Sequence, residues 1–318
     1  MQNSISKIPV QVFLDYVVEK LRKSNPFLAF SVDESAKVLG GAVVHIPQSG
    51  ASPKTVKNRS TFPATAVKRE DSFITYALNE YSTDPTHVTW HEENEISYDK
   101  TDSVLNDHVE TLMEVVGDDM IYSWFTGFKT DGKTPDVIPQ KNVVFTSGAS
   151  RAAFEEGQTG NRKKLTYKDI QNLAVKFNKA NVKKQERYLM LESNMYQELI
   201  ESLSENQMAA FQAAANVEEG VVGKLCGFKV MDRSTVAYFT SSGTPIVPGA
   251  ALSATDCVGG IAWQKDCVAR ALGDIVPFQD LANPMYYGDI FSALVKAGGR
   301  CRRADWAGVC AIVEGTAA

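Results

Sequence analysis

The sequence lacks the features typical of membrane-spanning, secreted and metal-binding proteins. No apolar run approaches the ~20 residues that a helix needs to cross a bilayer, and the first residues, Met-Gln-Asn-Ser-Ile-Ser-Lys, contain no apolar secretory core. The five cysteines are odd in number and no two are spaced C-x-x-C, so we expect buried, reduced thiols rather than disulfides or a zinc site. These absences predict a protein that is made and folded in a cytoplasm.

Several common catalytic motifs are missing as well. No G-x-G-x-x-G follows a predicted strand, no H-E-x-x-H occurs, and Ser147 lies in Thr-Ser-Gly-Ala rather than in a nucleophile elbow. His87 and His91 could bind a metal, but on a strand they share a face only loosely. Asp118 and Asp119 could form a carboxylate pair, but near a helix end such residues are usually solvated. The sequence therefore predicts no catalytic residue, no cofactor and no metal site.

The composition is that of a large globular protein with a mildly acidic balance. Its 318 residues are 44% hydrophobic and 22% charged, enough for a large core in one elaborate domain or two. With 33 basic and 38 acidic residues the net charge is −5, whereas a protein that grips nucleic acid usually has a strongly basic face. We interpret the basic clusters at 162–164, 183–187 and 300–303 as solvated faces or subunit contacts.

Residues 9–23 form the most regular amphipathic helix pattern. Apolar side chains recur at i, i+3, i+4 and i+7, charged side chains occupy the opposite face, and Pro26 ends the pattern. Such a helix needs an apolar surface to lie on, either the core of its own subunit or a neighbouring chain. Phe13 and Val17, in the middle of the apolar stripe, are candidate assembly contacts.

Residues 42–91 contain three strand patterns, at 42–47, 73–78 and 86–91. Residues 48–66 are polar, with few large apolar side chains. A projecting hairpin with a polar tip fits this composition; a disordered loop is the alternative, although structureless loops of ~20 residues are uncommon in compact domains. The tip is basic in an acidic protein, so its cations are candidate contacts with an acidic neighbour. They are Lys54, Lys57, Arg59, Lys68 and Arg69.

The longest helical pattern covers residues 99–125, about 40 Å at 1.5 Å per residue. His108 lies on its apolar side, where a histidine is usually a satisfied member of the core. Helix and strand patterns alternate after it, which indicates an α+β protein. The predicted elements are a strand at 143–146, a helix at 166–178 capped by Thr166, a strand at 187–192 and a helix at 194–203.

The last part of the chain, residues 257–314, is dense in glycine and in β-branched and small apolar residues. Residues 285–297 form a strand pattern with two apolar faces, so we expect both faces to be covered. Gly-Gly at 298–299 predicts a bend or bulge. Residues 303–308 then predict a hairpin connection into a strand at 309–313.

Two stretches of the chain have residue patterns that point to one family. The first is Arg-Tyr-Leu-Met-Leu at 187–191 followed by Met-Tyr-x-x-Leu at 195–199. The second contains Ala-Trp-Gln-Lys-Asp at 262–266, Tyr-Tyr-Gly-Asp-Ile at 286–290 and Gly-Gly-Arg at 298–300. These stretches resemble tailed-bacteriophage major capsid proteins, which have the Hong Kong 97 capsid fold. The order of elements agrees with that family over nearly the whole chain.

The resemblance implies an α+β fold of the Hong Kong 97 type with four parts. They are an N-terminal arm at 1–41, an extended β-hairpin (E-loop) at 42–98, a peripheral domain with a long spine helix and closing strands at 99–150 and 257–318, and an axial domain with a central mixed sheet at 151–256. Some capsids of this fold form Lys–Asn isopeptide cross-links, but the spacing of Lys54, Lys57 and Lys68 does not indicate that reaction.

The resemblance also implies a structural protein and not an enzyme. Its copies would self-assemble into pentamers and hexamers of an icosahedral or prolate shell around double-stranded DNA, bound without sequence specificity. The virion would assemble in the host cytoplasm, with scaffolding, portal and cement proteins as further partners and no membrane. Two alternatives stay open: an encapsulin-like compartment shell that encloses enzyme cargo, and a cytoplasmic enzyme with an unrecognised active site.

Overall fold

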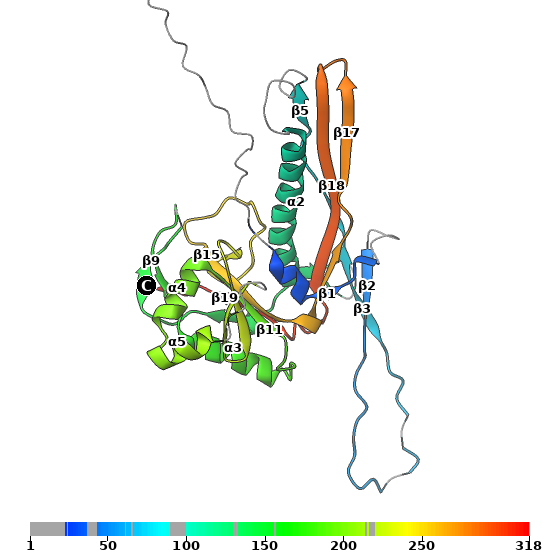
Figure 1. Cartoon of the computed structure of the whole chain (residues 1–318). Helices are drawn as coiled ribbons and strands as arrows, with labels where there is room; N and C mark the ends of the chain where they lie inside the picture. Colours follow the sequence, from blue (N-terminus) through cyan, green and yellow to red (C-terminus); the bar gives the residue numbers. More distant parts are fainter. Residues whose placement is uncertain are drawn as a thin grey trace, which may run out of the picture. The chain divides into compact units, whose positions relative to one another are not determined.

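The structure is a computed structural model in which most of the chain is described. The described residues are 23, 25–36, 43–60, 62–64, 66–89, 100–129, 131, 133–155, 157–213, 215 and 220–317. They divide into two compact units: a smaller one within Tyr81–Met113 and Ile275–Val295, and a larger one within Lys23–Glu80, Glu114–Asp274 and Lys296–Ala318. Helix α2 (Lys100–Phe125) and strand β18 (Gly288–Cys301) contribute residues to both units (Figure 1).

The smaller unit is built on the first part of β18. β17 (Val276–Asn283) and β5 (Thr86–Thr89) both pair with it in antiparallel fashion, and β4 (Asn79–Ser82) also pairs with β18. Phe291, Ala293 and Val295 are buried along one face of β18, while the residues between them are only half-buried. One face of β18 is therefore fully covered, as expected, and the other face is covered only in part.

The larger unit contains a seven-stranded mixed sheet in the order β12-β13-β11-β15-β19-β8, with β14 paired to β15. β11 runs parallel to β13 and β8 parallel to β19, and the other pairs are antiparallel. Every residue of β11 and β15 is buried, so these central strands are covered on both faces. The strands are β8 (Val143–Phe145), β11 (Arg187–Glu192), β12 (Val221–Leu225), β13 (Phe228–Arg233), β14 (Ala237–Phe239), β15 (Cys257–Gln264) and β19 (Val309–Val313).

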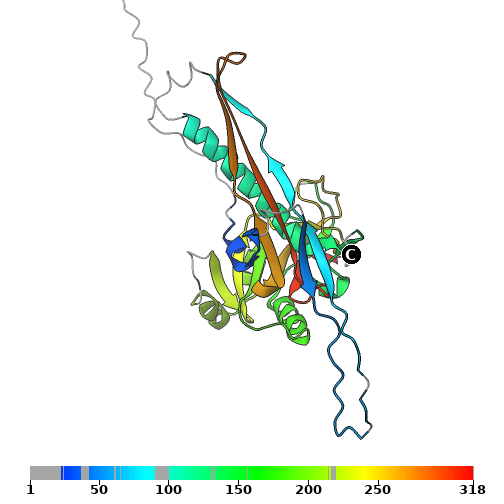
Figure 2. The same cartoon turned by 90° about the vertical axis from the view of Figure 1, so that its right-hand side faces the viewer.

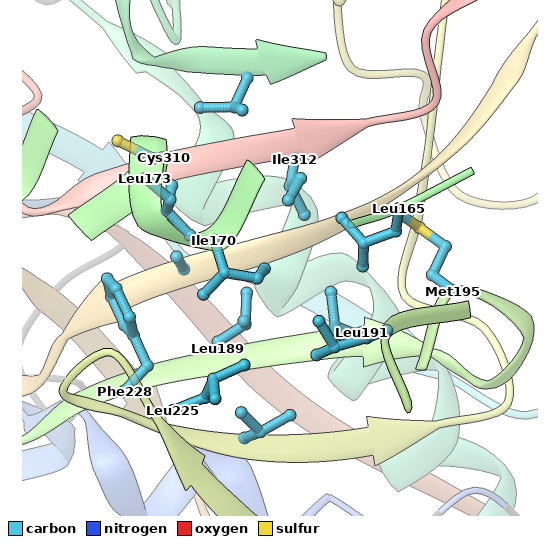
Figure 3. Packing of buried hydrophobic residues seen from close by; sticks show 14 of the residues in the cluster. Leu165, Ile170, Leu173, Leu189, Leu191, Met195, Leu225, Phe228, Cys310 and Ile312 are labelled. Carbon is cyan, nitrogen blue, oxygen red and sulfur yellow. The ribbon is translucent and has the colours of Figure 1, made fainter. Parts of the chain in front are cut away.

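Three helices supply apolar side chains to one core of this unit: α3 (Tyr167–Lys179), α4 (Ser193–Glu201) and α5 (Glu205–Gln212). Figure 3 shows Ile170 and Leu173 of α3 lying close to Leu189 of the sheet. The predicted cap of α3 is confirmed, because the Thr166 and Asp169 side chains form a capping box.

An aromatic cluster adds to the packing of the larger unit. Phe27, in the short 3₁₀ helix η1 (Pro26–Phe30), meets Trp124 and Trp263 edge-on, with ring centroids 5.7 and 6.5 Å apart. Tyr188 of β11 stacks on Trp263 at 5.5 Å. Aromatic rings in these arrangements contribute about 0.5–1.5 kcal/mol per pair beyond their buried area.

Shorter elements complete the larger unit. β16 (Val268–Leu272) pairs with the last part of β18 and, in parallel, with β1 (Val32–Asp33). β2 (Val43–Gln48) and β3 (Ser72–Ala77) form an antiparallel hairpin. The remaining elements are β6 (Thr126–Phe128), β7 (Pro135–Val137), β9 (Ser150–Ala152), β10 (Asn161–Lys163), β20 (Thr316–Ala317), and the 3₁₀ helices η3 (Gln140–Asn142) and η4 (Lys265–Cys267).

The predicted bend at 298–299 is wrong, because β18 continues through both glycines in register with β16. The two glycines permit close packing instead. A Cβ atom at Gly298 would lie 2.6 Å from the carbonyl oxygen of Ala77, and one at Gly299 would lie 2.7 Å from the carbonyl oxygen of Ala269. Glycine therefore marks a close backbone approach here and not a change of chain direction.

The predicted hairpin at the end of the chain is also wrong. β19 forms at the expected residues, but it pairs with β15 and β8, whereas β18 pairs with β16 in a different sheet. The connection at 303–308 therefore joins two sheets. In addition, β15 and β19, from the range 257–318, share a sheet with β11 and β13, from the range 151–256.

Candidate assembly surface

A long exposed loop, residues 49–71, joins β2 and β3 (Figure 1, Figure 2). The predicted hairpin is confirmed, because β2 and β3 pair along their full length. All described residues from 51 to 71 are exposed, and the large apolar side chains Val56, Phe62 and Val67 are 46%, 74% and 87% exposed. These side chains belong to no core and are available for contact with another molecule.

The predicted cationic contacts all lie exposed on this loop: Lys54, Lys57, Arg59, Lys68 and Arg69. Arg69 is bound within the loop, where its Nε and Nη2 donate to Asp71 at 2.6 and 3.1 Å. This guanidinium, with the N–H of Gly50, lowers the pKa of Asp71. The other four cations form no ion pair with any residue that the structure describes. The other two predicted contacts, Phe13 and Val17, lie outside the described residues.

The base of the hairpin is fastened to the larger unit by an apolar cluster and by hydrogen bonds. The Tyr76 hydroxyl donates to Glu34 Oε2 at 3.0 Å, and burial together with this carboxylate raises the pKa of Tyr76. Gln48 Nε2 donates to the carbonyl oxygen of Arg302 at 2.8 Å. The apolar cluster consists of Val44, Ile46, Ile74, Tyr76, Ala269 and Ala271.

Arg300, near the end of β18, links three elements at the hairpin base. Its side chain is 1% exposed; Nη1 donates to the carbonyl oxygen of Thr75 in β3 at 2.6 Å, and Nη2 lies 3.7 Å from Asp136 Oδ2 in β7. Burial lowers the pKa of Arg300. The Trp306 indole N–H donates to the same Asp136 oxygen at 3.1 Å, and a Cβ atom at Gly127 would lie 2.5 Å from Arg300 Nε. A buried cation with these partners makes the hairpin base costly to distort.

A second set of contacts fastens the residues that precede η1. Arg233, buried in β13, donates to Asn25 Oδ1 at 3.0 Å and to Asp118 of α2. Lys23 Nζ donates to the other carboxylate oxygen of Asp118 at 3.0 Å. The interpretation of Asp118 as a solvated helix-end carboxylate is therefore wrong, because it is the central acceptor between two cations.

The histidines and cysteines noted in the sequence are the remaining candidates. His108 is buried as predicted and burial lowers its pKa, and its Nε2 has no hydrogen-bond partner among the described residues. His91 lies outside the described residues. Within the described ranges no three His, Cys, Asp or Glu side chains are grouped to hold a metal ion. No helix among them is long and apolar enough to span a membrane. The five cysteines are free thiols; four are buried and Cys226 is half-buried.

Residues 127–134, Gly-Phe-Lys-Thr-Asp-Gly-Lys-Thr, match the G-x-x-x-x-G-K-[ST] pattern of phosphate-binding loops. Such a loop needs a following helix whose N-terminal N–H groups face the phosphate. Here the segment connects β6 to β7, and the backbone N–H groups of Lys133 and Thr134 both donate to Asp131 Oδ1 at 2.9 Å. The Thr134 hydroxyl and these N–H groups lower the pKa of Asp131 to about 2. The Asp131 carboxylate thus accepts from N–H groups that a phosphate would need. The sequence match therefore does not form a nucleotide-binding loop.

Comparison with known proteins finds a likeness in structure only. The sequence matches no protein-family model and no curated protein. The structure is similar to the capsid asymmetric unit of cyanophage Pam1, with a TM-score of 0.67, 11% identity and coverage of 98% of both chains. It is also similar to the capsid of Ralstonia phage GP4, with a TM-score of 0.64, 12% identity and coverage of 100% of this chain and 98% of the other. The chain has the capsid fold of tailed bacteriophages.

A structure of Mycobacterium phage Che8 matches with a TM-score of 0.62, 14% identity and coverage of 97% of this chain and 98% of the other. The predicted α+β capsid fold of the Hong Kong 97 type is thus confirmed. Within the capsid fold, β2 and β3 with loop 49–71 form the predicted extended hairpin, and α2 is the predicted long helix.

Proposed function

We propose that this chain is the major capsid protein of a tailed bacteriophage, a structural protein rather than an enzyme. Its copies self-assemble into pentamers and hexamers of an icosahedral or prolate shell that encloses double-stranded DNA. The observation that supports this proposal is a fold shared with phage capsids over at least 97% of this chain and 98% of the three compared chains. The less favoured alternative functions are an encapsulin-like shell and a cytoplasmic enzyme.

The proposed assembly elements are the N-terminal arm and the extended hairpin. The N-terminal arm, residues 1–41, would present Phe13 and Val17 to a neighbouring subunit. The extended hairpin, residues 42–98, would place the cations of loop 49–71 on an acidic neighbour. The peripheral domain (99–150 and 257–318) and the axial domain (151–256) would form the body. Each subunit then offers different patches to its neighbours, and such heterologous contacts generate closed rings.

The net charge of the chain supports a shell that encloses DNA rather than a protein that binds DNA tightly. At a net charge of −5 the wall repels phosphate at short range, and salt screens that repulsion beyond about 8–10 Å. Double-stranded DNA would be enclosed without sequence-specific contacts. The virion is the proposed location, assembled in the host cytoplasm, with scaffolding, portal and cement proteins as further partners.

Negative-stain microscopy of the expressed protein, combined with the ratio of absorbance at 260 and 280 nm, tests this function. We expect rings or closed shells. The chain can also be expressed together with the other phage genes. Shells that then carry enzyme cargo and no nucleic acid would favour the encapsulin-like compartment shell. A monodisperse monomer of 34.8 kDa at high concentration and across salt conditions would contradict every shell function.

A further inference from the structure

The two arms of loop 49–71 are joined at their root by three residues, Gly50, Arg69 and Asp71, which we call the loop clasp. The clasp lies directly beyond the end of the β2–β3 ladder. The Gly50 N–H donates to Asp71 Oδ1 at 2.7 Å, which links the outgoing arm to the returning arm. Arg69 Nε and Nη2 donate to the two oxygens of the same carboxylate at 2.6 and 3.1 Å.

The close approach of the two arms requires a glycine at position 50. A Cβ atom there would lie 2.0 Å from the carbonyl oxygen of Glu70 and 3.2 Å from Cγ of Arg69. Because backbone stands where any other side chain would begin, an alanine would have to push the arms apart. The Arg69 stem thus lies against Gly50 while its guanidinium holds Asp71, so the three residues close the root of the loop together.

Among the described residues, the clasp is the last polar contact that holds the loop. No hydrogen bond or ion pair ties the described residues between 51 and 68 to another described element. The exposed side chains of Val56, Phe62 and Val67 therefore depend on the clasp for their direction. Association costs less free energy when such groups are already oriented, because less conformational entropy is lost in the contact.

The exposure of the Arg69–Asp71 pair decides what the clasp can do. The two side chains are 56% and 53% exposed, and ion pairs at such exposure contribute little to the stability of a fold. The bidentate, charge-assisted geometry nevertheless fixes the direction of both side chains. The pair is therefore suited to orient the loop rather than to stabilise the subunit.

We propose that Arg69 is a positioning residue for assembly, which orients the loop through Gly50 and Asp71 and does not itself contact a neighbour. This inference rests on the proposed function, since it concerns the loop as an assembly arm. It changes the role that the sequence predicted for Arg69. The contact cations are then the four that form no ion pair with any described residue: Lys54, Lys57, Arg59 and Lys68.

The clasp is tested first on the unassembled full chain. The Gly50 amide proton is followed by NMR as the pH is lowered, because its hydrogen bond reports the charge on Asp71. Arg69 and the Gly50 N–H lower the pKa of Asp71, so the resonance should move at a pH below that of an ordinary aspartate. Arg69→Gln should raise this midpoint. The matched control Lys68→Gln removes the same charge at the adjacent exposed position and should leave the midpoint nearly unchanged. Equal midpoints in the two variants would overturn the clasp.

The role in assembly is tested by the protein concentration needed for shells, measured over a series of salt concentrations. Arg69→Gln and the uncharged change Gly50→Ala should both raise that concentration about fivefold and keep the salt dependence of the wild type. Lys68→Gln should instead flatten the salt dependence, because an ion pair with a neighbour is lost. Thermal melts of all three variants should match the wild type, which separates positioning from folding.

Two outcomes would overturn the positioning role. If Arg69→Gln flattens the salt dependence as much as Lys68→Gln does, Arg69 is a contact cation. If Gly50→Ala forms shells at the wild-type concentration, the closed root does not matter for assembly. Failure of the wild-type chain to form shells would overturn the proposed function and the assembly role with it, while the pH titration still decides whether the clasp closes the loop.

Discussion

Arg300 Nη1 donates a 2.6 Å hydrogen bond to the carbonyl oxygen of Thr75, a residue 225 positions earlier in the chain. The bond ties the end of β18 to the strand that leads out of the exposed loop 49–71. Because Arg300 also faces Asp136 of β7, one buried guanidinium holds β3, β7 and β18 together. The geometry of the hairpin base thus depends on a residue that lies far from the hairpin in sequence.

Arg300→Met should lower the free energy of unfolding by about 3 kcal/mol, because it leaves Asp136 without its buried cation and Thr75 without its donor. Arg300→Lys should recover only part of this loss, since lysine lacks the planar fork that reaches both partners. Urea unfolding measures the energy, and hydrogen exchange should accelerate in β3. The control Lys296→Met, at an exposed position of the same strand, should change stability by less than about 0.5 kcal/mol. Unchanged exchange in β3 would refute the link.

Gly117→Ala should destabilise the chain, although alanine is the better helix former by about 1 kcal/mol. Gly117 lies within α2, and a Cβ atom there would lie 2.5 Å from the side-chain nitrogen of Asn25. In the Asn25→Ala background, Gly117→Ala should instead stabilise the chain. The obstructing amide is gone there, and the higher helix propensity of alanine remains. Thermal melts of the four proteins in this double-mutant cycle measure the coupling. Additive effects would show that Asn25 does not obstruct position 117.

Deletion of residues 50–70, with the ends joined by a short Gly-Ser turn, should leave a folded subunit that forms no closed shell. The loop has no buried described residue between 51 and 70, and loop closure changes by only ~0.6 kcal/mol per halving of length. Circular dichroism follows folding and microscopy follows assembly. Neutralising Lys54, Lys57, Arg59 and Lys68 together should weaken assembly, and high salt should weaken wild-type assembly in the same way. Normal shells from the deletion would show that the hairpin is not an assembly arm.

The thiols of the folded chain should react slowly with a thiol reagent at pH 8. Burial raises the pKa of Cys267 to about 11, and of Cys301 and Cys310 to about 12. The thiolate is the reactive form, so its fraction at pH 8 falls to roughly a thousandth or less. Absorbance of released thionitrobenzoate should report all five thiols only after unfolding in urea. Rapid reaction of the buried thiols in the native chain, or shells that dissolve in reductant alone, would contradict the assignment of free, buried thiols.

The local elements were predictable from the amino-acid sequence. Helix α3 with its Thr166 cap, the pairing strands β2 and β3 and the buried strand β11 appear within one or two residues of their predicted bounds. Each has a local signal in the sequence, such as a cap, a turn residue or a 3.6- or 2-residue apolar period. The exposed cations of loop 49–71 were predictable for the same reason, because composition alone shows that no core can form there.

The choice of neighbouring strands and of polar partners depends on contacts between segments far apart in the sequence. The pattern of β19 is the same whether it pairs with β18 or with β15, since the two-residue period records burial and not the identity of the neighbour. The glycines at 298 and 299 serve backbone approach rather than a bend because Ala77 and Ala269 happen to lie beside them. Arg300 likewise found its partners 225 and 164 positions away, and no local pattern encodes contacts at such separations.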